Sequence, residues 1–488
     1  MITSLEGING VIDKLADEVM TMPDPKSGKP KRALIGDQLE MLKLSIRTIM
    51  AESLSILYTQ NAYREASIHK RSGHYTKSRY CQNLSYKIHV LRAYEGLKAL
   101  GYLYETKQGV SIGPVGKYLT RYIATEKLTK LFTTDEFESL PVVLKKPNNT
   151  DSIRVTSKFK RKDSKTGKVV TVKALVDYED NELTNRLRSN LTIINKVLDA
   201  NWIDLELPDD EIACMQVKVQ DDTDDADISP AINFNSRILH RVFNDIDFTL
   251  GGRFYGGWWQ GIPSEYREHI LINGKRTCEV DYSTYHPTML YLMDGHTPPE
   301  DPYIAVVKRL ACTNEKLGRK GIKLVFNAML NANKPMTQPP RNFNPEDYGL
   351  RSWKEASDAV LKVHELIAHH FYSGVGLKLQ RLDSDIAETV MLYFAEMNIP
   401  VLPVHDSFIV HSGYESALIE QMNKAYEEVF STSPLTKVDN FLSRYTPSDD
   451  EHHDFNLGGV TIEQALEYMN IGHERRLEIF RSSREQMY

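Results

Sequence analysis

The feature that most constrains this chain is a pair of aspartates, each at the end of a strand-like segment. Asp281 closes the alternating run Thr277-Cys278-Glu279-Val280, which is typical of a half-buried strand. Asp406 stands between the apolar runs 399–404 and 408–410, a pattern that predicts the tip of a β-hairpin. A fold that satisfies both patterns mounts two carboxylates on rigid strand ends.

The segment between these aspartates carries cations at helical spacing. Arg319, Lys323, Phe326 and Leu330 recur at steps of three and four residues, which predicts a helix from Arg319 to Leu330. Two cations one turn apart can hold a triphosphate. Two carboxylates that converge from separate strands can hold the pair of Mg²⁺ ions that phosphoryl transfer uses. We therefore expect Asp281 and Asp406 to bind two Mg²⁺ ions, with Mn²⁺ as the alternative metal.

In this order, the three segments resemble the motifs of family A DNA polymerases and of the related single-subunit RNA polymerases of phages and mitochondria. Motif A of that family centres on Asp-Tyr-Ser, which is Asp281–Ser283 here. Motif B has Arg and Lys four residues apart, as Arg319 and Lys323 are, and motif C is a His-Asp pair on a hairpin, as His405 and Asp406 are. Each motif alone is weak, and their joint order is what is specific.

Two upstream segments extend the resemblance. Gly252-Arg253-Phe254 and Trp259-Gln260-Gly261-Ile262-Pro263 are similar to segments that precede motif A in the family, where the Arg lies along the primer-template minor groove. The resemblance covers about residues 237–445 and implies a right-hand polymerase palm with fingers. It also implies that Arg253 and Gln260 contact nucleic acid.

The resemblance assigns the remaining site residues. Asp281 and Asp406 are the metal ligands, and His405 and Lys323 join them as catalytic residues. The residues expected at the nucleotide are Arg319, Lys323, Tyr282, Ser283, His286, Asn327 and Asn331.

Three departures from the family leave the choice of sugar open. His286 replaces the Glu that crowds the sugar 2′ position, and Asn331 replaces the Tyr that helps to select the sugar. Ser407 follows the His-Asp pair, as in the RNA polymerases. The first hypothesis is a DNA-dependent DNA polymerase without a proofreading exonuclease. The second is an RNA polymerase or primase, and the third is a replication-initiator or regulatory DNA-binding protein with an inactive polymerase fold.

A basic segment supplies the local positive charge that nucleic-acid binding needs. The formal net charge is −6, which excludes a uniformly basic surface. Alternation around Ile153, Val155 and Phe159, followed by Thr166-Gly167 and further valines, predicts a basic β-hairpin. Its phosphate-contacting residues are expected to be Lys158, Lys160, Arg161 and Lys162.

The N-terminal region has its own pattern. A helix is predicted from Gln38 to Leu57, and a second helix begins after Ser85 and stops at Gly101. Strands at 102–105 and 110–112 around a Lys107-Gln108-Gly109 turn complete a unit that resembles a winged helix-turn-helix. Its DNA-facing residues would be Lys87, His89 and Arg92, and the alternative is an ordinary packing unit.

Four regions follow from these patterns in a mixed α/β (α+β) chain. They are a mainly helical region with the winged-helix-like unit (1–130), a region of basic ribbon, thumb-like helix from Asn181 to Ile203 and acidic linker (131–236), the palm and fingers (237–445), and a helical tail (446–488). The tail contains Glu451-His452-His453-Asp454, which is read as exposed surface.

Composition and cysteine usage fit an intracellular enzyme. The chain is 41% hydrophobic and 26% charged, its four cysteines lack metal-ligand spacing, and it has no apolar stretch of membrane-spanning length. We expect a soluble protein in the cytoplasm, or in the host-cell nucleoid if it is encoded by a phage, plasmid or other mobile element. Its expected partners are a DNA primer-template and nucleoside triphosphates; the sequence identifies no protein partner.

Overall fold

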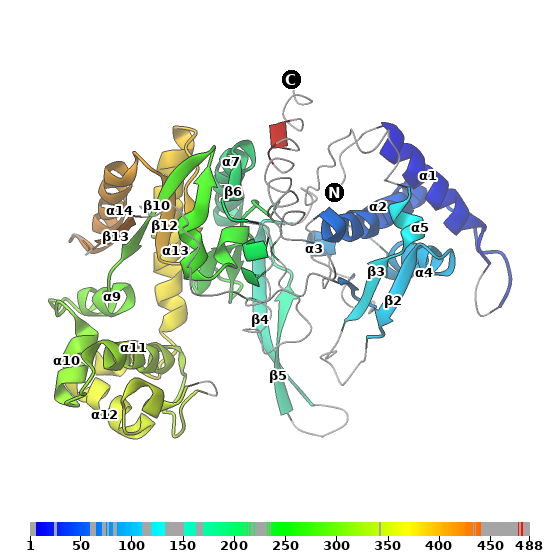
Figure 1. Cartoon of the computed structure of the whole chain (residues 1–488). Helices are drawn as coiled ribbons and strands as arrows, with labels where there is room; N and C mark the ends of the chain where they lie inside the picture. The colour runs from blue at the N-terminus through cyan, green and yellow to red at the C-terminus, as the bar shows by residue number, and fades with distance from the viewer. Residues whose placement is uncertain are drawn as a thin grey trace.

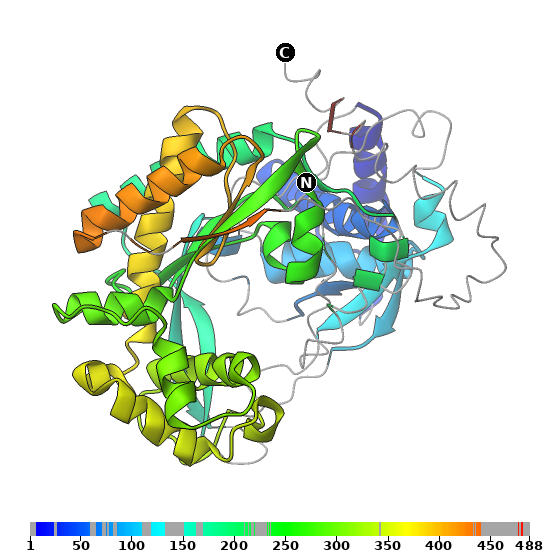
Figure 2. The same ribbon diagram turned by 60° about the vertical axis from the view of Figure 1, so that its left-hand side comes forward.

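The structure is a computed structural model of the whole chain. It describes residues 6–23, 27–58, 65–70, 75, 78–81, 85–109, 119–131, 151–162, 169–208, 210–212, 214, 215, 219, 232, 234, 236–340, 343–432, 434, 436–440, 477, 480 and 481. Figure 1 shows an N-terminal unit, a central sheet, a helical lobe and, between the lobe and the N-terminal unit, a two-stranded ribbon; Figure 2 gives a second view of the same arrangement.

The N-terminal unit packs helices against a small antiparallel sheet of order β1-β3-β2. Its elements are α1 (Glu6–Thr21), α2 (Asp37–Tyr58), β1 (Ala66–Ile68), α3 (Ser78–Cys81), the π-helical turn η2 (Tyr86–Val90), α4 (Leu91–Ala99), β2 (Leu103–Lys107), β3 (Thr120–Ala124) and α5 (Glu126–Thr129). Its apolar side chains form a core of their own, which includes Leu15, Ile46 and Tyr94.

Several expectations for this unit are confirmed and others are wrong. The helix from Gln38 to Leu57 is α2, and Gly101 ends the second helix with φ of +78°. The partner of β2 is β3 at 120–124, and the expected strand at 110–112 lies outside the described residues. Strand β1 pairs with β3 and was not predicted from the sequence pattern.

The prediction is wrong for two of the three residues that were expected to face DNA. His89 is buried, with Nδ1 accepting from the Ser85 amide and Nε2 bonded to Gln38. Arg92 is also buried and donates to the main-chain carbonyls of Arg32 and Met20. Both side chains therefore tie the unit together, whereas Lys87 is exposed.

The ribbon belongs to a four-stranded sheet of order β5-β4-β7-β8. Its strands are β4 (Ile153–Lys162), β5 (Val169–Val176), β7 (His240–Phe243) and β8 (Gly251–Tyr255). The pairing of β4 with β5 runs from Val155↔Val176 to Lys162↔Val169 and confirms the expected hairpin. Because β4 also pairs in parallel with β7 at Ile153↔Arg241, the ribbon continues a sheet that reaches the body of the protein.

Arg79 of α3 joins the N-terminal unit to the base of this ribbon. Its guanidinium forms ion pairs with Asp151, Asp177 and Asp180 and stacks on the Tyr178 ring, with 4.1 Å from the guanidinium carbon to the ring centroid. These opposite charges raise the pKa of Arg79 although burial acts to lower it. One arginine thus bridges segments about a hundred residues apart.

The central sheet has the order β11-β12-β10-β9-β6. Strand β13 pairs with β10 along the edge opposite to β12. Its strands are β6 (Ile203–Leu205), β9 (Ile270–Ile272), β10 (Lys275–Tyr282), β11 (Leu402–Val404), β12 (Ser407–His411) and β13 (Thr436–Asn440). The Asn273-Gly274 turn between β9 and β10 has φ of +53° and +74°, as a tight hairpin requires.

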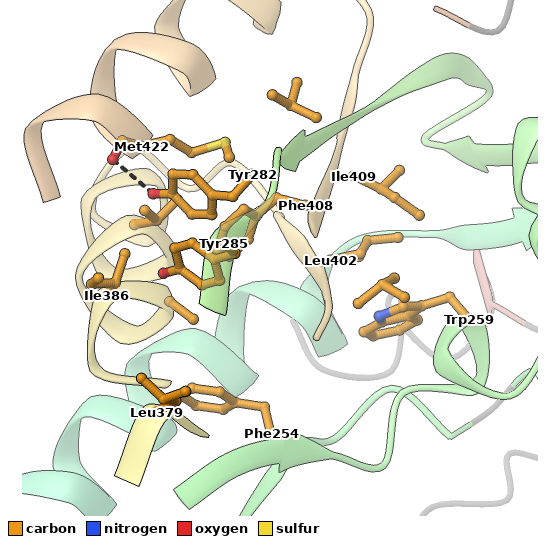
Figure 3. Packing of buried hydrophobic residues seen from close by; sticks show 14 of the residues in the cluster. Phe254, Trp259, Tyr282, Tyr285, Leu379, Ile386, Leu402, Phe408, Ile409 and Met422 are labelled. Carbon is orange, nitrogen blue, oxygen red and sulfur yellow. Dashed lines mark hydrogen bonds between the residues drawn. The ribbon is translucent and has the colours of Figure 1, made fainter. Parts of the chain in front are cut away.

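Both faces of the central sheet are covered, which explains the nearly continuous burial of β10. Around it lie α9 (Tyr285–Met293), α13 (Gly376–Glu396) and α14 (Glu415–Phe430), and the short helices η3 (Trp258–Gln260) and η4 (Ser264–His269). Figure 3 shows Tyr282 and Phe408 beside Met422 on one side, and Leu402 beside Trp259 on the other. The Trp259 indole N–H donates to the Pro403 carbonyl at 3.1 Å.

The helical lobe is inserted between α9 and α13. It consists of α10 (Pro302–Arg309), α11 (Glu315–Asn331), η5 (Pro345–Tyr348), α12 (Trp353–Val363) and η6 (Glu365–His370). Helix α11 confirms the helix expected from Arg319 to Leu330, and its buried face includes Ile322, Phe326 and Leu330.

The amphipathic helix expected from Asn181 to Ile203 is α7 (Glu182–Ala200) followed by β6. Asn181 caps α7 through a capping box with Thr184. A single buried cluster extends from Ile153 to Tyr426 and includes the α7 side chains, so the expected regions 131–236 and 237–445 share one core.

Parts of two expected segments lie outside the described residues. In the acidic linker, the apolar side chains of Ile212, Met215 and Val219 are buried in the main core, whereas Asp210 is exposed. The tail is described only at Leu477, Phe480 and Arg481, and His452 and His453 are outside the description. Among the described helices, none is long and apolar enough to cross a membrane.

A buried histidine links the lobe to α9. The His364 ring is fully buried, its Nδ1 lies 2.9 Å from the Tyr291 hydroxyl, and its Nε2 lies 3.0 Å from the Pro302 carbonyl. Because a carbonyl only accepts, Nε2 carries the proton and Nδ1 accepts from tyrosine. Burial lowers the pKa of His364 from 6.5 to about 4.

We predict that this histidine makes the folded state acid-sensitive. Between pH 6.5 and about 4, His364 is protonated in the unfolded chain but stays neutral in the folded chain. The free energy of unfolding therefore decreases as the pH falls through this range, by about 3 kcal/mol in total. Urea unfolding followed by tryptophan fluorescence should show this loss, because all four tryptophans are buried and lie outside the N-terminal unit. His364→Gln should flatten the pH dependence, whereas His411→Ala should leave it unchanged.

Candidate functional site

Strand pairing brings Asp281 and Asp406 together. Asp281 is directly opposite Ser407 in the register of β10 and β12, and the neighbouring Tyr282 amide donates to the Asp406 carbonyl at 3.4 Å. Asp406 occupies the two-residue turn between β11 and β12 with His405, whose φ is +58°. Two aspartates that are far apart in the chain are therefore adjacent on neighbouring strand ends.

The Asp406 carboxylate remains available. It is partly exposed, and among the described residues no side chain forms a hydrogen bond or an ion pair with it. Asp281 is also partly exposed. The Asp406 carboxylate can therefore accept a further ligand without losing a hydrogen bond or ion pair to a described residue.

Tyr303 of α10 connects this pair of carboxylates to the lobe. Burial raises the pKa of its hydroxyl; Arg319 acts to lower that pKa, and Asp406, Asp301 and Asp281 raise it further. The Arg319 guanidinium carbon lies 5.2 Å from the centroid of the Tyr303 ring. Arg319 and both aspartates therefore act electrostatically on one buried tyrosine hydroxyl.

The two cations of α11 differ in their surroundings. Arg319 donates to Asp301, the N-cap of α10, with 2.6 Å between Nε and Oδ2. Lys323 is exposed and forms no hydrogen bond or ion pair with any residue that the structure describes. Further along the helix, Asn327 is partly exposed and its carbonyl accepts from the Asn331 amide at 2.8 Å.

A buried cluster of charges lies beside the aspartates. Asp383 of α13, of which 1% of the side chain is exposed, pairs with Arg253 of β8 and lies 3.1 Å from His286 Nε2. Since a carboxylate only accepts, Nε2 of His286 carries the proton in this contact. Arg253 Nη2 also lies 3.3 Å from His286 Nε2, so β8, α9 and α13 meet at this point.

The electrostatics of this cluster extend to the hairpin. Burial acts to lower the pKa of Arg253, but the Asp383 charge outweighs it, and the pKa is raised with a further contribution from Asp406. Desolvation lowers the pKa of His405, and the positive charge of Arg253 lowers it further, whereas the negative charge of Asp406 acts to raise it. Part of the His405 residue is nevertheless exposed to solvent. His405 is therefore neutral at physiological pH.

Several residues expected at the substrate serve the fold. The Tyr282 ring is buried, stacks on Tyr285 with 4.4 Å between centroids, and donates its hydroxyl to the Met422 carbonyl (Figure 3). The amide of Gln260 donates to the carbonyls of Phe254 and Pro403. The Tyr282 ring is therefore held inside the protein, whereas Gln260 and Ser283 are partly exposed.

Ser407 also has a structural role. It is buried and its hydroxyl donates to Glu279 and to the Val404 carbonyl, while Glu279 pairs with Arg267. The serine that resembles the RNA polymerases therefore fixes the hairpin and does not point toward a sugar.

Three residues of the site were not identified from the sequence. Tyr303 and Asp301 belong to α10, which the motifs do not cover, and Asp383 belongs to α13. A signal for Asp383 was present, because it falls at a helical step from Leu379 and Ile386, on the face that the helix buries. A carboxylate on an apolar helix face predicts a buried ion pair.

Comparison with known proteins leaves the function open. No family model matches the chain, and no curated protein matches it. Among solved structures, the chain is similar to the POL domain of Pol1 from M. smegmatis in complex with DNA primer-template and dNTP. The likeness covers 52% of this chain and 51% of that chain, at 13% sequence identity and a TM-score of 0.28. That TM-score decides neither fold nor activity, so function must be inferred from this chain's own residues.

We predict that the Asp383 cluster stabilises the fold as a unit. Asp383→Ala leaves Arg253 buried without its counter-charge, which should cost about 3 to 5 kcal/mol of unfolding free energy. The double variant Arg253→Met/Asp383→Leu should recover most of that loss. Urea unfolding measures both, and Glu396→Ala, at an exposed position of the same helix, serves as the control. Equal effects of Asp383→Ala and Glu396→Ala would contradict the assignment.

Proposed function

We propose that this chain is a template-directed nucleotidyltransferase, specifically a DNA-dependent DNA polymerase without a proofreading exonuclease. The central sheet with α13 and α14 is its palm, and the helical lobe is its fingers. One observation carries the proposal: the register of β10 and β12 brings Asp281 beside Asp406 on strand ends that point to one site.

The donor set fits Mg²⁺. Two partly exposed carboxylates on neighbouring strands offer only oxygen, the ligand that Mg²⁺ prefers, and Asp406 has no competing partner among the described residues. When bound there, Mg²⁺ would reduce the electrostatic repulsion between an attacking 3′ oxygen and a phosphate. Asp281 and Asp406 hold the metals in this proposal, and the neutral His405 beside them orients the primer end.

The cations of the lobe suit the triphosphate. Lys323 is exposed and unpaired among described residues, so its ammonium can meet a phosphate without first losing a protein partner. Arg319 lies on the same face one turn away and exchanges Asp301 for phosphate in this proposal. Oxygens of the triphosphate would then lie between α11 and the two aspartates.

His286 is the candidate for sugar selection. Its ring is fixed by Asp383 and Arg253, so a ribose 2′ hydroxyl would meet a rigid side chain. Deoxynucleotides are therefore the expected substrates, and the RNA polymerase or primase hypothesis rests on the resemblance at Ser407 and on Asn331.

The ribbon is the proposed contact with the nucleic-acid backbone. Lys158 and Lys173 are exposed and directly opposite each other on β4 and β5, and Lys160 follows on the same face. Like charges directly opposite on two strands repel. A polyanion such as DNA relieves that repulsion, which favours a phosphate-binding face over ordinary solvated surface.

The N-terminal unit is proposed to be a winged-helix-like module that contacts DNA through fewer residues than expected. Its order of helix, glycine, strand, connection and strand supports this, and the exposed Lys87 is the remaining candidate contact. His89 and Arg92 are excluded because they are buried.

The metal-site assignment makes a direct prediction. Asp281→Ala and Asp406→Ala should each lower nucleotide incorporation by several orders of magnitude, because each removes a metal-ligand carboxylate. Primer extension with dNTPs and NTPs in parallel measures this, and DNA binding by fluorescence anisotropy should stay at the parent level. Asp247→Ala, at an exposed position, is the control.

The same assay separates the hypotheses. Incorporation that survives in either aspartate variant overturns the active-site assignment, and a parent that extends with NTPs favours the RNA polymerase or primase. A folded parent that binds DNA but extends no primer with either set of nucleotides supports the initiator or regulatory protein.

The ribbon makes a separate prediction about salt. Neutralising Lys158, Lys160, Arg161 and Lys162 together should weaken DNA binding. The slope of log affinity against log salt concentration should become less steep by roughly two to four. Incorporation at saturating DNA should not change. The matched control neutralises four exposed cations elsewhere, namely Arg351, Lys354, Lys362 and Lys378. Equal slopes for the ribbon variant and the parent would exclude this contact.

A further inference from the structure

A second group of metal-ligating side chains lies where α9 meets η6. Asp294 ends α9, and His369 and His370 end η6. His370 Nε2 is 3.0 Å from both carboxylate oxygens of Asp294, and His369 Nε2 is 3.4 Å from Oδ2. One ligand atom from each residue lies within 4.8 Å of the other two.

The position of Asp294 at a helix C-terminus is unfavourable for a negatively charged side chain. It is the C-cap of α9, where the helix dipole is negative and a carboxylate is unfavourable. Its side chain is only 18% exposed, and its ion-pair partners among the described residues are the two histidines.

The geometry matches a compact coordination sphere. Ligands about 2.0 to 2.1 Å from a tetrahedral metal are about 3.3 Å from each other, and the observed separations from Asp294 are 3.0 and 3.4 Å. Asp294 and His370 are mostly buried, whereas His369 is 64% exposed, which leaves water free to supply a fourth ligand.

We propose that Asp294, His369 and His370 bind one divalent transition-metal ion of the zinc class. Two imidazole nitrogens and one carboxylate oxygen suit such ions, whereas Mg²⁺ prefers oxygen alone. The site is separate from Asp281 and Asp406 in its residues and in its donor atoms, and it does not depend on the proposed function.

The metal would link the helical lobe to the end of α9, which follows the central strand β10. Helix α9 follows β10, which carries Asp281, and η6 connects α12 of the lobe to α13. A metal bound to both ends restrains the lobe at its base, near the buried contact between His364 and Tyr291. Its role is therefore structural.

Zinc binding to the full chain tests this proposal. Protein stripped with EDTA should take up Zn²⁺ at one site with Asp281 and Asp406 both replaced by alanine, so that the other carboxylate pair does not contribute. Co²⁺ in place of Zn²⁺ should give the visible absorption of a tetrahedral nitrogen and oxygen site, and zinc should raise the thermal midpoint of the parent.

Ligand variants give the decisive comparison. Loss of even an outer-shell partner weakens metal sites by about 10- to 100-fold, so His370→Ala should weaken Zn²⁺ by at least about 100-fold. His369→Ala should also weaken it, and since that ring is exposed this variant keeps the test valid if His370→Ala does not fold. His411→Ala is the control. Zinc affinity and thermal shift that are the same in the parent and in His369→Ala overturn the proposal.

Discussion

The register between β10 and its neighbours determines how Asp281 and Asp406 lie relative to each other. Side chains alternate along a strand, so a slip by one residue would turn Asp281 to the opposite face and separate it from Asp406. Several interactions hold the register. The Asn273-Gly274 turn fixes one end of β10, and the bond from Ser407 to the buried Glu279 fixes its pairing with β12 near the other. The aspartates are thus positioned by the sheet and need no contact with each other.

Charged side chains of α13 tie the four-stranded sheet to this arrangement. Arg241 of β7 is fully buried and bonds to Ser384, Asp385 and Glu388, while Arg253 of β8 pairs with Asp383. Burying such pairs is costly, and apolar side chains of the same volume could provide similar stability. What the ion pairs add is a defined orientation of α13 against β7 and β8. That orientation carries Asp383 to His286 and so shapes the surroundings of the aspartates.

The sequence was informative where the pattern was local. Strand β10, helix α11, the β11–β12 hairpin and the basic ribbon all follow from periodicity and turn residues, because each is decided by neighbours in the chain. Contacts between distant segments were not predictable in this way. Burial of His89 and Arg92 depends on Gln38, Arg32 and Met20, and the structural role of Ser407 depends on Glu279. A polar residue in a motif-like position can therefore belong to the core, and sequence alone did not separate these cases.

The position of β10 in the sheet has a consequence for the order of folding. The N-terminal unit has its own core and mostly nearby contacts, so it can fold soon after it leaves the ribosome. By contrast, β10 needs β12 and β13, and the Glu279–Ser407 bond joins residues 128 apart. Closing loops of that length is slow compared with local pairing. The two aspartates can meet only after β12 has been synthesised as far as His411, so the nascent chain can complete its N-terminal core before it completes the candidate site.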